Sequence, residues 1–194
     1  MARTGRVSRE QSELNRNSII ATSSQLFRDR GLDGVSLKDI MSAAGLTHGG
    51  FYGHFSSKEE LEAIACEKAF EDSHASLDER GIKSFSQLVD YYLSPPHRDC
   101  PASGCAVAAL VTDVQRKGED TAVSQAFLAG LKNMTEQFRS LKNGPDDAPV
   151  KDEYLAQFSM MVGALMLARA TRGDELSARL LAAAKSALLG KTSD

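Results

Sequence analysis

The sequence predicts an all-α fold, and three observations support this prediction. Apolar residues recur at alternating spacings of four and three, most regularly in the series Phe127, Leu131, Met134, Phe138 and Leu141. No period-two alternation of the kind typical of β-strands competes with this pattern. Serine or threonine stands where several helices would begin, and glycine where several would end. We therefore predict helices along the chain, in a small N-terminal unit and a larger helical body.

The first predicted helix covers residues 15–30, with Ile19 and Phe27 on its apolar side, and it ends at Gly31. Residues 1–14 before it form a predicted flexible basic arm, which either reaches a DNA minor groove or stays solvated. The arginines of this arm are Arg3, Arg6 and Arg9. The first 30 residues hold six arginines against three acidic residues, although the whole chain has a net charge of −3. This asymmetry permits nucleic acid at the N-terminal end.

Two short helices follow the first one. Ser36 and Asp39 in the stretch SLKDIMSAAG are a capping-box signature, and Gly45 ends that helix. Thr47 is the predicted N-cap of the second short helix, in the stretch LTHGGFYGHFSSKEEL. A longer helix, two short helices and the connecting AGLT are the outline of a helix-turn-helix, whose second short helix lies in the DNA major groove.

The second short helix contains three glycines, and each costs about 0.8–1 kcal/mol relative to alanine inside a helix. Gly49 and Gly50 fall on its first turn, and Gly53 follows three residues later. A residue without Cβ lets the backbone approach a ligand closely, which explains the glycines if this helix meets DNA. Phe51 and Phe55, four residues apart, are predicted to anchor the helix to its neighbours. A long helix then begins after Ser57, where Glu60 completes a second predicted capping box.

The stretch VSLKDIMSAAGLTHGGFYGHFSSKEELEAIA resembles the DNA-binding domain of TetR/AcrR-family transcriptional repressors. The resemblance implies a three-helix DNA-binding domain over residues 15–62 and a helical effector-binding and dimerisation domain over residues 63–194. It also implies a homodimer that binds a palindromic double-stranded DNA operator and is released by a small-molecule effector. The candidate DNA-binding residues are Ser36, Thr47, His48, Gly49, Gly50, Tyr52, His54 and Lys58.

The resemblance assigns a role to most of these residues. Ser36, Thr47 and Tyr52 are expected to contact phosphate, and Lys58 matches a family lysine that meets the DNA backbone. His48 is the main candidate for base contact, and His54 either contacts DNA or packs within the domain. Gly50 and Gly53 depart from the family pattern and leave fewer side chains to contact bases.

The helical body is predicted to hold the effector pocket and the dimer interface. Its helices are marked by Phe85 to Tyr92, by Val107 to Val114 and by residues 120–141, with a break at residues 94–104 and a loop at KNGPDDAP. The candidate pocket residues are Tyr91, Tyr92, Phe127, Met134, Phe158 and Met161. The last two helices, YLAQFSMMVGALMLARA and DELSARLLAAAKSALL, are so apolar that a second copy of the chain is expected to cover them.

The sequence leaves two other functions open. Cys100 and Cys105 flank a proline- and glycine-containing loop and could bridge on oxidation in a thiol-based redox-sensing repressor, although ordinary buried or loop thiols are the favoured interpretation. A helical dimerisation or small-molecule-binding module with little sequence-specific DNA binding is the second alternative. No catalytic constellation, cofactor motif or metal-ligand spacing is present, so we expect no enzyme. Without a signal peptide or a run of about 20 apolar residues, we expect a cytoplasmic protein without a membrane segment.

Overall fold

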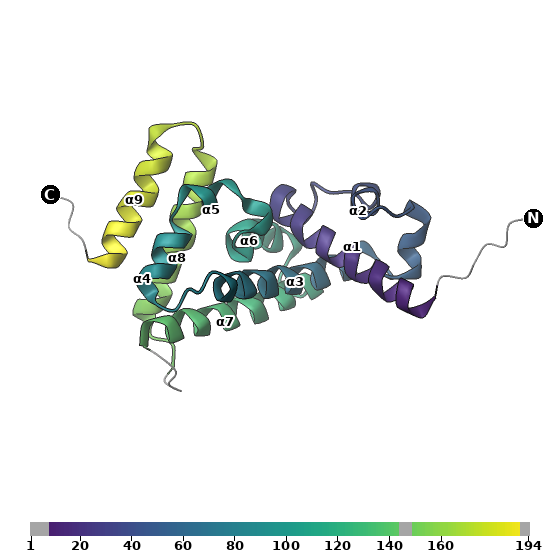
Figure 1. The fold of residues 1–194 in the computed structure, drawn as a ribbon, viewed down its shortest axis with the longest axis horizontal. Helices are drawn as coiled ribbons and strands as arrows, with labels where there is room; N and C mark the ends of the chain where they lie inside the picture. Colours follow the sequence, from purple (N-terminus) through teal and green to yellow (C-terminus); the bar gives the residue numbers. More distant parts are fainter. Residues whose placement is uncertain (1–7, 144–148, 191–194) are drawn as a thin grey trace, which may run out of the picture.

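The computed structural model describes residues 8–143 and 149–190, and every regular element in these ranges is a helix. The predicted all-α fold is therefore confirmed. The N-terminal helices lie at one end of an elongated molecule, and α8 and α9 lie at the other (Figure 1). None of the described helices has the length and apolarity of a membrane-spanning segment.

The N-terminal elements are α1 (Arg9–Arg30), α2 (Leu37–Ala43), the 3₁₀ helix η1 (His48–Gly53) and α3 (Lys58–Glu79). The body contains α4 (Phe85–Tyr92), α5 (Pro95–Asp99), the 3₁₀ turn η2 (Pro101–Ser103), α6 (Ala106–Lys117), α7 (Ala122–Asn143), α8 (Asp152–Ala170) and α9 (Glu175–Leu189). Helix α3 continues past the predicted domain boundary at residue 62 and packs against both α1 and α7. It therefore connects the two parts of the chain.

Helix α1 begins six residues earlier than predicted. The Ser8 hydroxyl accepts a hydrogen bond of 3.1 Å from the Gln11 amide, which caps the helix, and Arg9 pairs with Glu13 across one turn. Residues 9–14, all polar except Leu14 and mostly exposed, thus form the first part of α1, and the predicted arm is too long. Arg3 and Arg6 lie outside the described residues.

The predicted break at residues 94–104 contains two short helical elements, α5 and η2. Ser94 caps α5 by accepting from the His97 amide, and Pro95 occupies the first helical position, where its missing N–H costs nothing. The prolines that suggested an interruption therefore begin helical turns. This segment also brings His97 into the interior, where only 5% of the residue is exposed.

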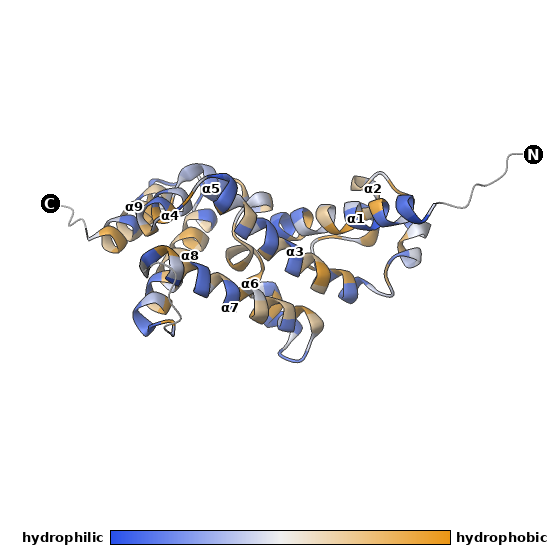
Figure 2. Ribbon diagram, turned by 60° about the horizontal axis from the view of Figure 1, so that its bottom comes forward, coloured by the Kyte–Doolittle hydropathy of each residue, from blue (hydrophilic) through white to orange (hydrophobic). Residues whose placement is uncertain are grey.

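The long helices pack mainly through apolar side chains. Figure 2 shows hydrophobic residues recurring along α8 and α9 as well as inside the body. Helix α9 packs on α8, and α7 lies along α3. In the N-terminal part, Phe27, Ile40, Phe51 and Leu61 are at most 1% exposed and form a core between α1, α2, η1 and α3.

Candidate functional site

The turn between α2 and η1 is set by local hydrogen bonds. The predicted capping box at Ser36 and Asp39 is present in full, so the start of α2 is confirmed. Its end is formed by Gly45 at φ +72°, a conformation that favours glycine, followed by the Leu46 amide donating to the Met41 carbonyl at 2.8 Å. This turn determines the direction in which η1 leaves α2.

Two aromatic side chains hold η1 against the domain. Phe51 is fully buried and Phe55 is 3% exposed, and their rings stack with centroids 5.5 Å apart. Arg16 of α1 covers the Phe55 ring at 4.3 Å and donates to the His54 carbonyl. Arg16 was missed in the sequence analysis because nothing in its spacing marks it. These contacts orient the opposite side of η1 toward solvent.

The second short helix is a 3₁₀ helix rather than an α-helix. Its hydrogen bonds include that of the Gly50 amide to the Thr47 carbonyl at 3.0 Å. Thr47 occupies the predicted N-cap position, but its side chain makes no capping hydrogen bond, so its predicted capping role is wrong. Three glycines in six residues explain the short, tight form, because each weakens an α-helix.

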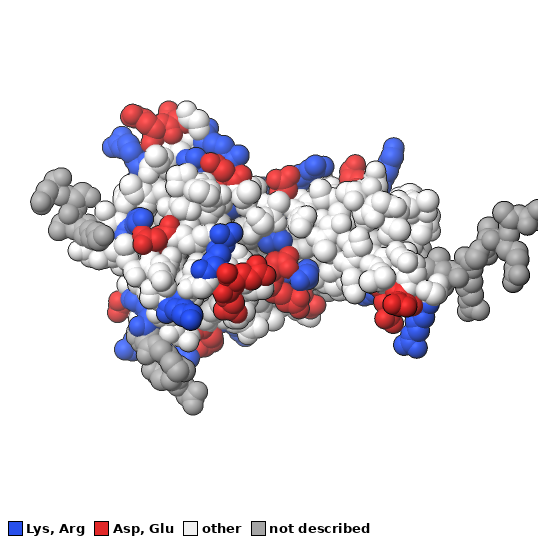
Figure 3. Space-filling model, viewed as in Figure 1, with Lys and Arg blue, Asp and Glu red and all other residues white. Residues whose placement is uncertain are grey.

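Most candidate DNA-binding residues of η1 lie together on an outward face. Thr47, His48, Gly49, Tyr52 and Gly53 are exposed, whereas Gly50 and His54 are half-buried. Tyr52 is 68% exposed, which is high for an aromatic side chain. On the face in Figure 3, charged side chains are sparse at the N-terminal end and gather over the rest of the body. The described part of this face therefore carries no broad basic patch at its N-terminal end.

The interior of the protein does not require glycine at the three positions in η1. A Cβ at Gly49 or Gly53 would meet nothing within 4 Å, and at Gly50 it would make ordinary contacts, the nearest being Met41 at 3.7 Å. None of the three has a positive φ. The missing side chains of Gly49 and Gly53 thus leave free space on the outside of η1.

Ser36 and Lys58, both expected to contact DNA phosphates, have partners within the protein. The Ser36 hydroxyl and amide both donate to the Asp39 carboxylate. The Lys58 ammonium donates to the Leu32 carbonyl at 2.7 Å and lies 3.5 Å from the buried Glu62 carboxylate. Phosphate contact by these two residues stays a prediction. Lys38, the second residue of α2, is exposed and makes no ion pair with the described residues, so it is a further candidate that the sequence analysis overlooked.

The second predicted capping box is only half formed. The Ser57 hydroxyl accepts from the Glu60 amide at 3.1 Å, as expected. The Glu60 carboxylate, however, accepts from the amide and hydroxyl of Ser56 at 2.7 and 2.6 Å rather than from Ser57. These hydrogen bonds lower the pKa of Glu60. The Glu60 side chain therefore links the first turn of α3 to Ser56, one residue before the N-cap, rather than to the N-cap itself.

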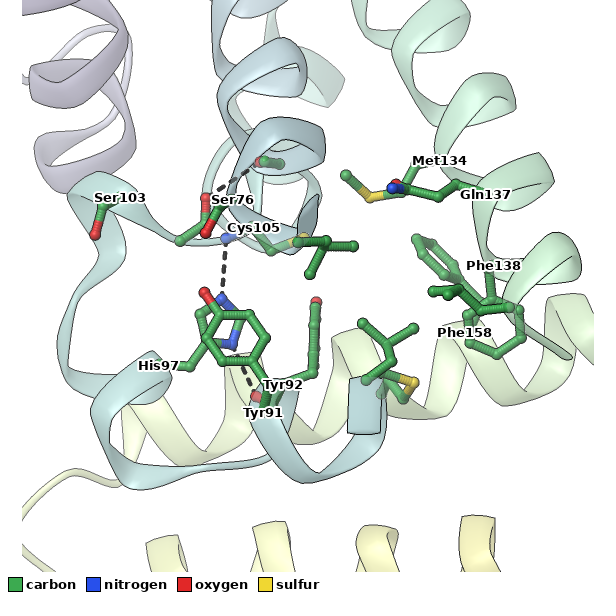
Figure 4. A pocket seen from close by; sticks show the side chains of 16 residues that line it. Ser76, Tyr91, Tyr92, His97, Ser103, Cys105, Met134, Gln137, Phe138 and Phe158 are labelled. Carbon is green, nitrogen blue, oxygen red and sulfur yellow. Dashed lines mark hydrogen bonds between the residues drawn. The ribbon is translucent and has the colours of Figure 1, made fainter. Parts of the chain in front are cut away.

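A cavity lies in the helical body between α3, α4, α7 and α8, with about 50 Å³ of space between its side chains. Five of the six predicted pocket residues line it, namely Tyr91, Tyr92, Met134, Phe158 and Met161. Tyr91, Tyr92 and His97 come from one side and Met134, Phe138 and Phe158 from the other (Figure 4). The sixth, Phe127, packs edge-on against Phe70 with centroids 5.5 Å apart, so its assignment to the pocket is wrong. Phe127 lies seven residues before Met134 on the same side of α7, but at its position this side of the helix packs against α3.

His97 connects two walls of this cavity. Its Nδ1 donates to the Tyr92 carbonyl at 2.8 Å, and its Nε2 accepts from the Cys105 amide at 3.2 Å. Burial lowers the pKa of His97 to about 4, so the ring is neutral near pH 7. His97 was not among the predicted pocket residues, and its only sequence signal was its place in a proline-rich segment.

All three cysteines are free thiols. Cys105 is buried in the cavity wall, and Cys100 is exposed between α5 and η2. Burial raises the pKa of Cys66 to about 12, so this thiol stays protonated. The pair in the redox-sensing alternative, Cys100 and Cys105, is not bridged, and one of the two thiols is buried, so that alternative is not favoured. Among the residues described, no three His, Cys, Asp or Glu side chains gather in a group that could hold a metal ion.

Comparison with known proteins agrees with the geometry of the N-terminal domain. Residues 19–63 match the family described as bacterial regulatory proteins, tetR family. The transcriptional repressor KstR2 of Rhodococcus jostii is 28% identical over 140 residues, which cover 71% of this chain and 66% of that protein. The repressor NemR of Escherichia coli is 25% identical over 186 residues, which cover 88% of this chain and 92% of that protein.

The complete fold also has solved counterparts. A TetR transcriptional regulator from Chloroflexus aurantiacus superposes with a TM-score of 0.71 at 24% identity and covers 93% of this chain and 95% of its own. The helix-turn-helix and the helical body together define a DNA-binding transcriptional regulator. Residues 19–63 belong to the TetR family of these regulators, and the fold of the whole chain is that of solved TetR-family structures.

Proposed function

We propose that this chain is a repressor that binds a palindromic operator as a homodimer and is released by a small molecule bound in the cavity of the helical body. The observation that carries the proposal is the outward face of η1, where Tyr52, His48 and Thr47 stand beside glycines that no internal contact requires. Members of the family bind DNA and small-molecule ligands, typically as dimers.

At the DNA, the buried aromatics of η1 hold its exposed side in place. His48 is proposed to contact base edges, and Thr47 and Tyr52 to contact phosphates through their hydroxyl groups. Gly49 and Gly53 let the backbone of η1 approach the groove because no Cβ stands in the way. Few cationic side chains lie on this short helix, so its recognition of DNA depends largely on how closely its backbone and neutral side chains fit the groove.

Release by a ligand requires contact between the cavity and the DNA-binding domain. Gly104, which lines the cavity, accepts a hydrogen bond at its carbonyl from Arg28 of α1. A ligand that favours a different position of the 103–105 segment would therefore also favour a different position of α1. The expected result is a population shift between a state that fits the operator and one that does not.

The proposed dimer interface is formed by exposed apolar stripes on α8 and α9. Outward residues on α8 follow spacings of four and three, in the series Ala156, Met160, Gly163, Leu167 and Ala170. A similar series on α9 contains Leu176, Leu180, Ala183 and Ala187. Met160 and Leu167 are 43% and 55% exposed, and a Cβ at Gly163 would meet nothing within 4 Å. Small and apolar side chains in such stripes suit close packing of helices from two copies.

The proposal is tested by fluorescence anisotropy on duplex DNA from upstream of the chain's own gene, with a scrambled duplex of equal length beside it. Titrations run from about 50 to 200 mM salt, where a protein making 6–10 phosphate contacts loses on the order of 10³–10⁵ in affinity. We expect binding to the upstream duplex to persist at salt concentrations that abolish binding to the scrambled one.

Three variants assign the contacts. Tyr52→Ala should weaken binding to both duplexes equally, and His48→Ala should mainly reduce the preference for the upstream duplex. His74→Ala, which changes an exposed histidine of α3, is the matched control and should leave binding unchanged. If the wild-type dimer binds neither duplex, the chain is instead a helical dimerisation or small-molecule-binding module.

A further inference from the structure

The hydroxyl group of Tyr92 is a buried polar group without a partner. Tyr92 is 6% exposed, and its hydroxyl oxygen has no hydrogen bond to any described residue. The side chain lines the cavity, and the hydroxyl points into its space (Figure 4). Leaving a buried hydroxyl unpaired is unfavourable, and such groups are rare in native proteins.

The surroundings of Tyr92 are uncharged. Among the cavity-lining residues that the structure describes, none is Asp, Glu, Lys or Arg. Burial raises the pKa of Tyr92 well above its ordinary value, so the phenol keeps its proton. The neighbouring Cys105 thiol adds to this shift as a weak interaction partner, but its geometry makes no hydrogen bond to the hydroxyl. The nearby Arg169 guanidinium is outside the lining and donates to the carbonyls of His97 and Arg98. Arg80, also outside the lining, is exposed, covers the Tyr91 ring at 4.5 Å and donates to the Ser76 hydroxyl. A charged ligand inside the cavity would therefore lose its hydration without meeting an opposite charge in the lining.

Two polar residues that line the cavity beside Tyr92 are already engaged in hydrogen bonds, namely His97 and Ser73. Both ring nitrogens of His97 make hydrogen bonds within the protein. Ser73 donates to the backbone and accepts from the Ala106 amide. The Tyr92 hydroxyl is thus a buried donor without a partner at this end of a cavity whose opposite side is formed by Met134, Phe138 and Phe158.

From these contacts we infer that the Tyr92 hydroxyl donates a hydrogen bond to the oxygen of a neutral, mostly apolar ligand with a carbonyl-type acceptor. This inference rests on the proposed function, because it names the chemical class of the effector for the same cavity. The present space of about 50 Å³ holds only a few water molecules, so the ligand must displace flexible side chains. Met134 and Met161 supply that freedom through their unbranched thioether chains.

The test uses three probes of similar size: acetophenone, which carries a carbonyl oxygen, ethylbenzene, which lacks it, and benzoate, which is an anion. Binding to the full-length chain is followed by the NMR signals of ¹³C-labelled methionine methyl groups. Met134 and Met161 report on the cavity, and Met41 and Met160 lie outside its lining and serve as controls. We expect acetophenone to bind most tightly and to shift the two cavity methyl signals.

The decisive variant is Tyr92→Phe, with Tyr91→Phe as the matched control on the adjacent cavity tyrosine. Tyr92→Phe should weaken acetophenone about tenfold, as expected for one lost hydrogen bond, and leave ethylbenzene unchanged. Its Tm should equal or exceed that of wild type, because the deleted hydroxyl has no partner in the free protein. Tyr91→Phe should leave the preference for acetophenone over ethylbenzene intact.

Several results would overturn the inference: no binding of acetophenone in the cavity, equal affinity of Tyr92→Phe and wild type, tighter binding of benzoate, or a lowered Tm of Tyr92→Phe. Each of these results can occur while the chain still binds its upstream duplex. In that case only the inferred class of ligand is contradicted, and the proposed function is not. Conversely, Tyr92-dependent binding of acetophenone without DNA binding would refute the repressor proposal alone.

Discussion

The guanidinium of Arg28 donates a hydrogen bond of 3.2 Å to the carbonyl of Gly104, which joins the first DNA-binding helix to the wall of the body cavity. The same side chain pairs with Asp72 of α3 at 2.9 Å and donates to the Ser24 carbonyl. Arg28 is 4% exposed. A buried guanidinium with three partners on α1, α3 and the 103–105 segment fixes their relative positions.

Arg28→Met should destabilise the chain by about 3 kcal/mol, because it removes three charge-assisted hydrogen bonds from a buried site. Urea unfolding followed by circular dichroism measures the change. Arg30→Met is the control, because Arg30 is exposed on the same helix and should matter little. Equal stabilities of the two variants would show that the Arg28 contacts do not join the domains.

Replacing the outward glycines should separate stability from DNA binding. Gly49→Ala and Gly53→Ala should raise the free energy of unfolding by about 0.4–1 kcal/mol, because alanine fits the space and restricts the unfolded chain. The same variants should bind operator DNA more weakly, since the added Cβ stands on the contact face. Tm and fluorescence anisotropy give the two readouts.

Gly45→Ala is the contrasting control for the glycine variants. Gly45 has φ +72°, so alanine there is strained and should lower the Tm. If Gly49→Ala and Gly53→Ala both bind DNA with unchanged affinity, the backbone of η1 does not need to approach DNA closely at these positions.

His97 should make stability fall as the solution becomes acidic. Its pKa is about 4 in the folded chain and about 6.5 when unfolded, so below pH 6.5 the unfolded state takes up a proton that the folded state excludes. This contribution is fully present above pH 6.5 and is lost between pH 6.5 and 4. The loss between pH 7 and 5 should be about 2 kcal/mol.

Urea unfolding at pH 7 and 5 checks the His97 prediction in wild type and in His97→Gln, in which this part of the loss should vanish. His74→Gln, at an exposed position of α3, provides the comparison and should retain the wild-type loss. A His97→Gln variant with the full pH dependence would assign the effect to other groups.

Charges placed in the apolar stripe of α8 should break the dimer. Met160→Asp and Leu167→Asp should each weaken self-association by a factor of about 30 or more, as expected when a contact worth 2 kcal/mol or more is lost. Sedimentation velocity measures the change. The Tm of the monomer should be little affected, because both side chains are exposed in the single chain.

Leu128→Asp tests whether any exposed leucine behaves in this way. Leu128 is 52% exposed on α7, outside the proposed stripes, and its replacement should leave the dimer intact. Dissociation caused by Leu128→Asp alone would move the interface away from α8 and α9.

Features with local causes were predictable from the sequence. The capping box of Ser36 and Asp39, the glycine turn at Gly45 and the anchoring pair Phe51 and Phe55 all involve residues within a few positions of one another. Their physical chemistry depends on spacing along the chain, which the sequence contains directly. The helical periodicity of α7 and the apolar character of α8 are of the same kind.

The order of the long helices and the outline of the helix-turn-helix were thus determined by the sequence itself. Only the tertiary structure decided that Phe127 faces Phe70 instead of the cavity, that Lys58 is engaged by Leu32 and Glu62, and that Tyr92 has an unpaired hydroxyl. It also joined Arg28 to Gly104, 76 positions along the chain. Such relationships depend on how each helix is rotated and which neighbour it meets, and these are set by the packing of the whole core rather than by local spacing.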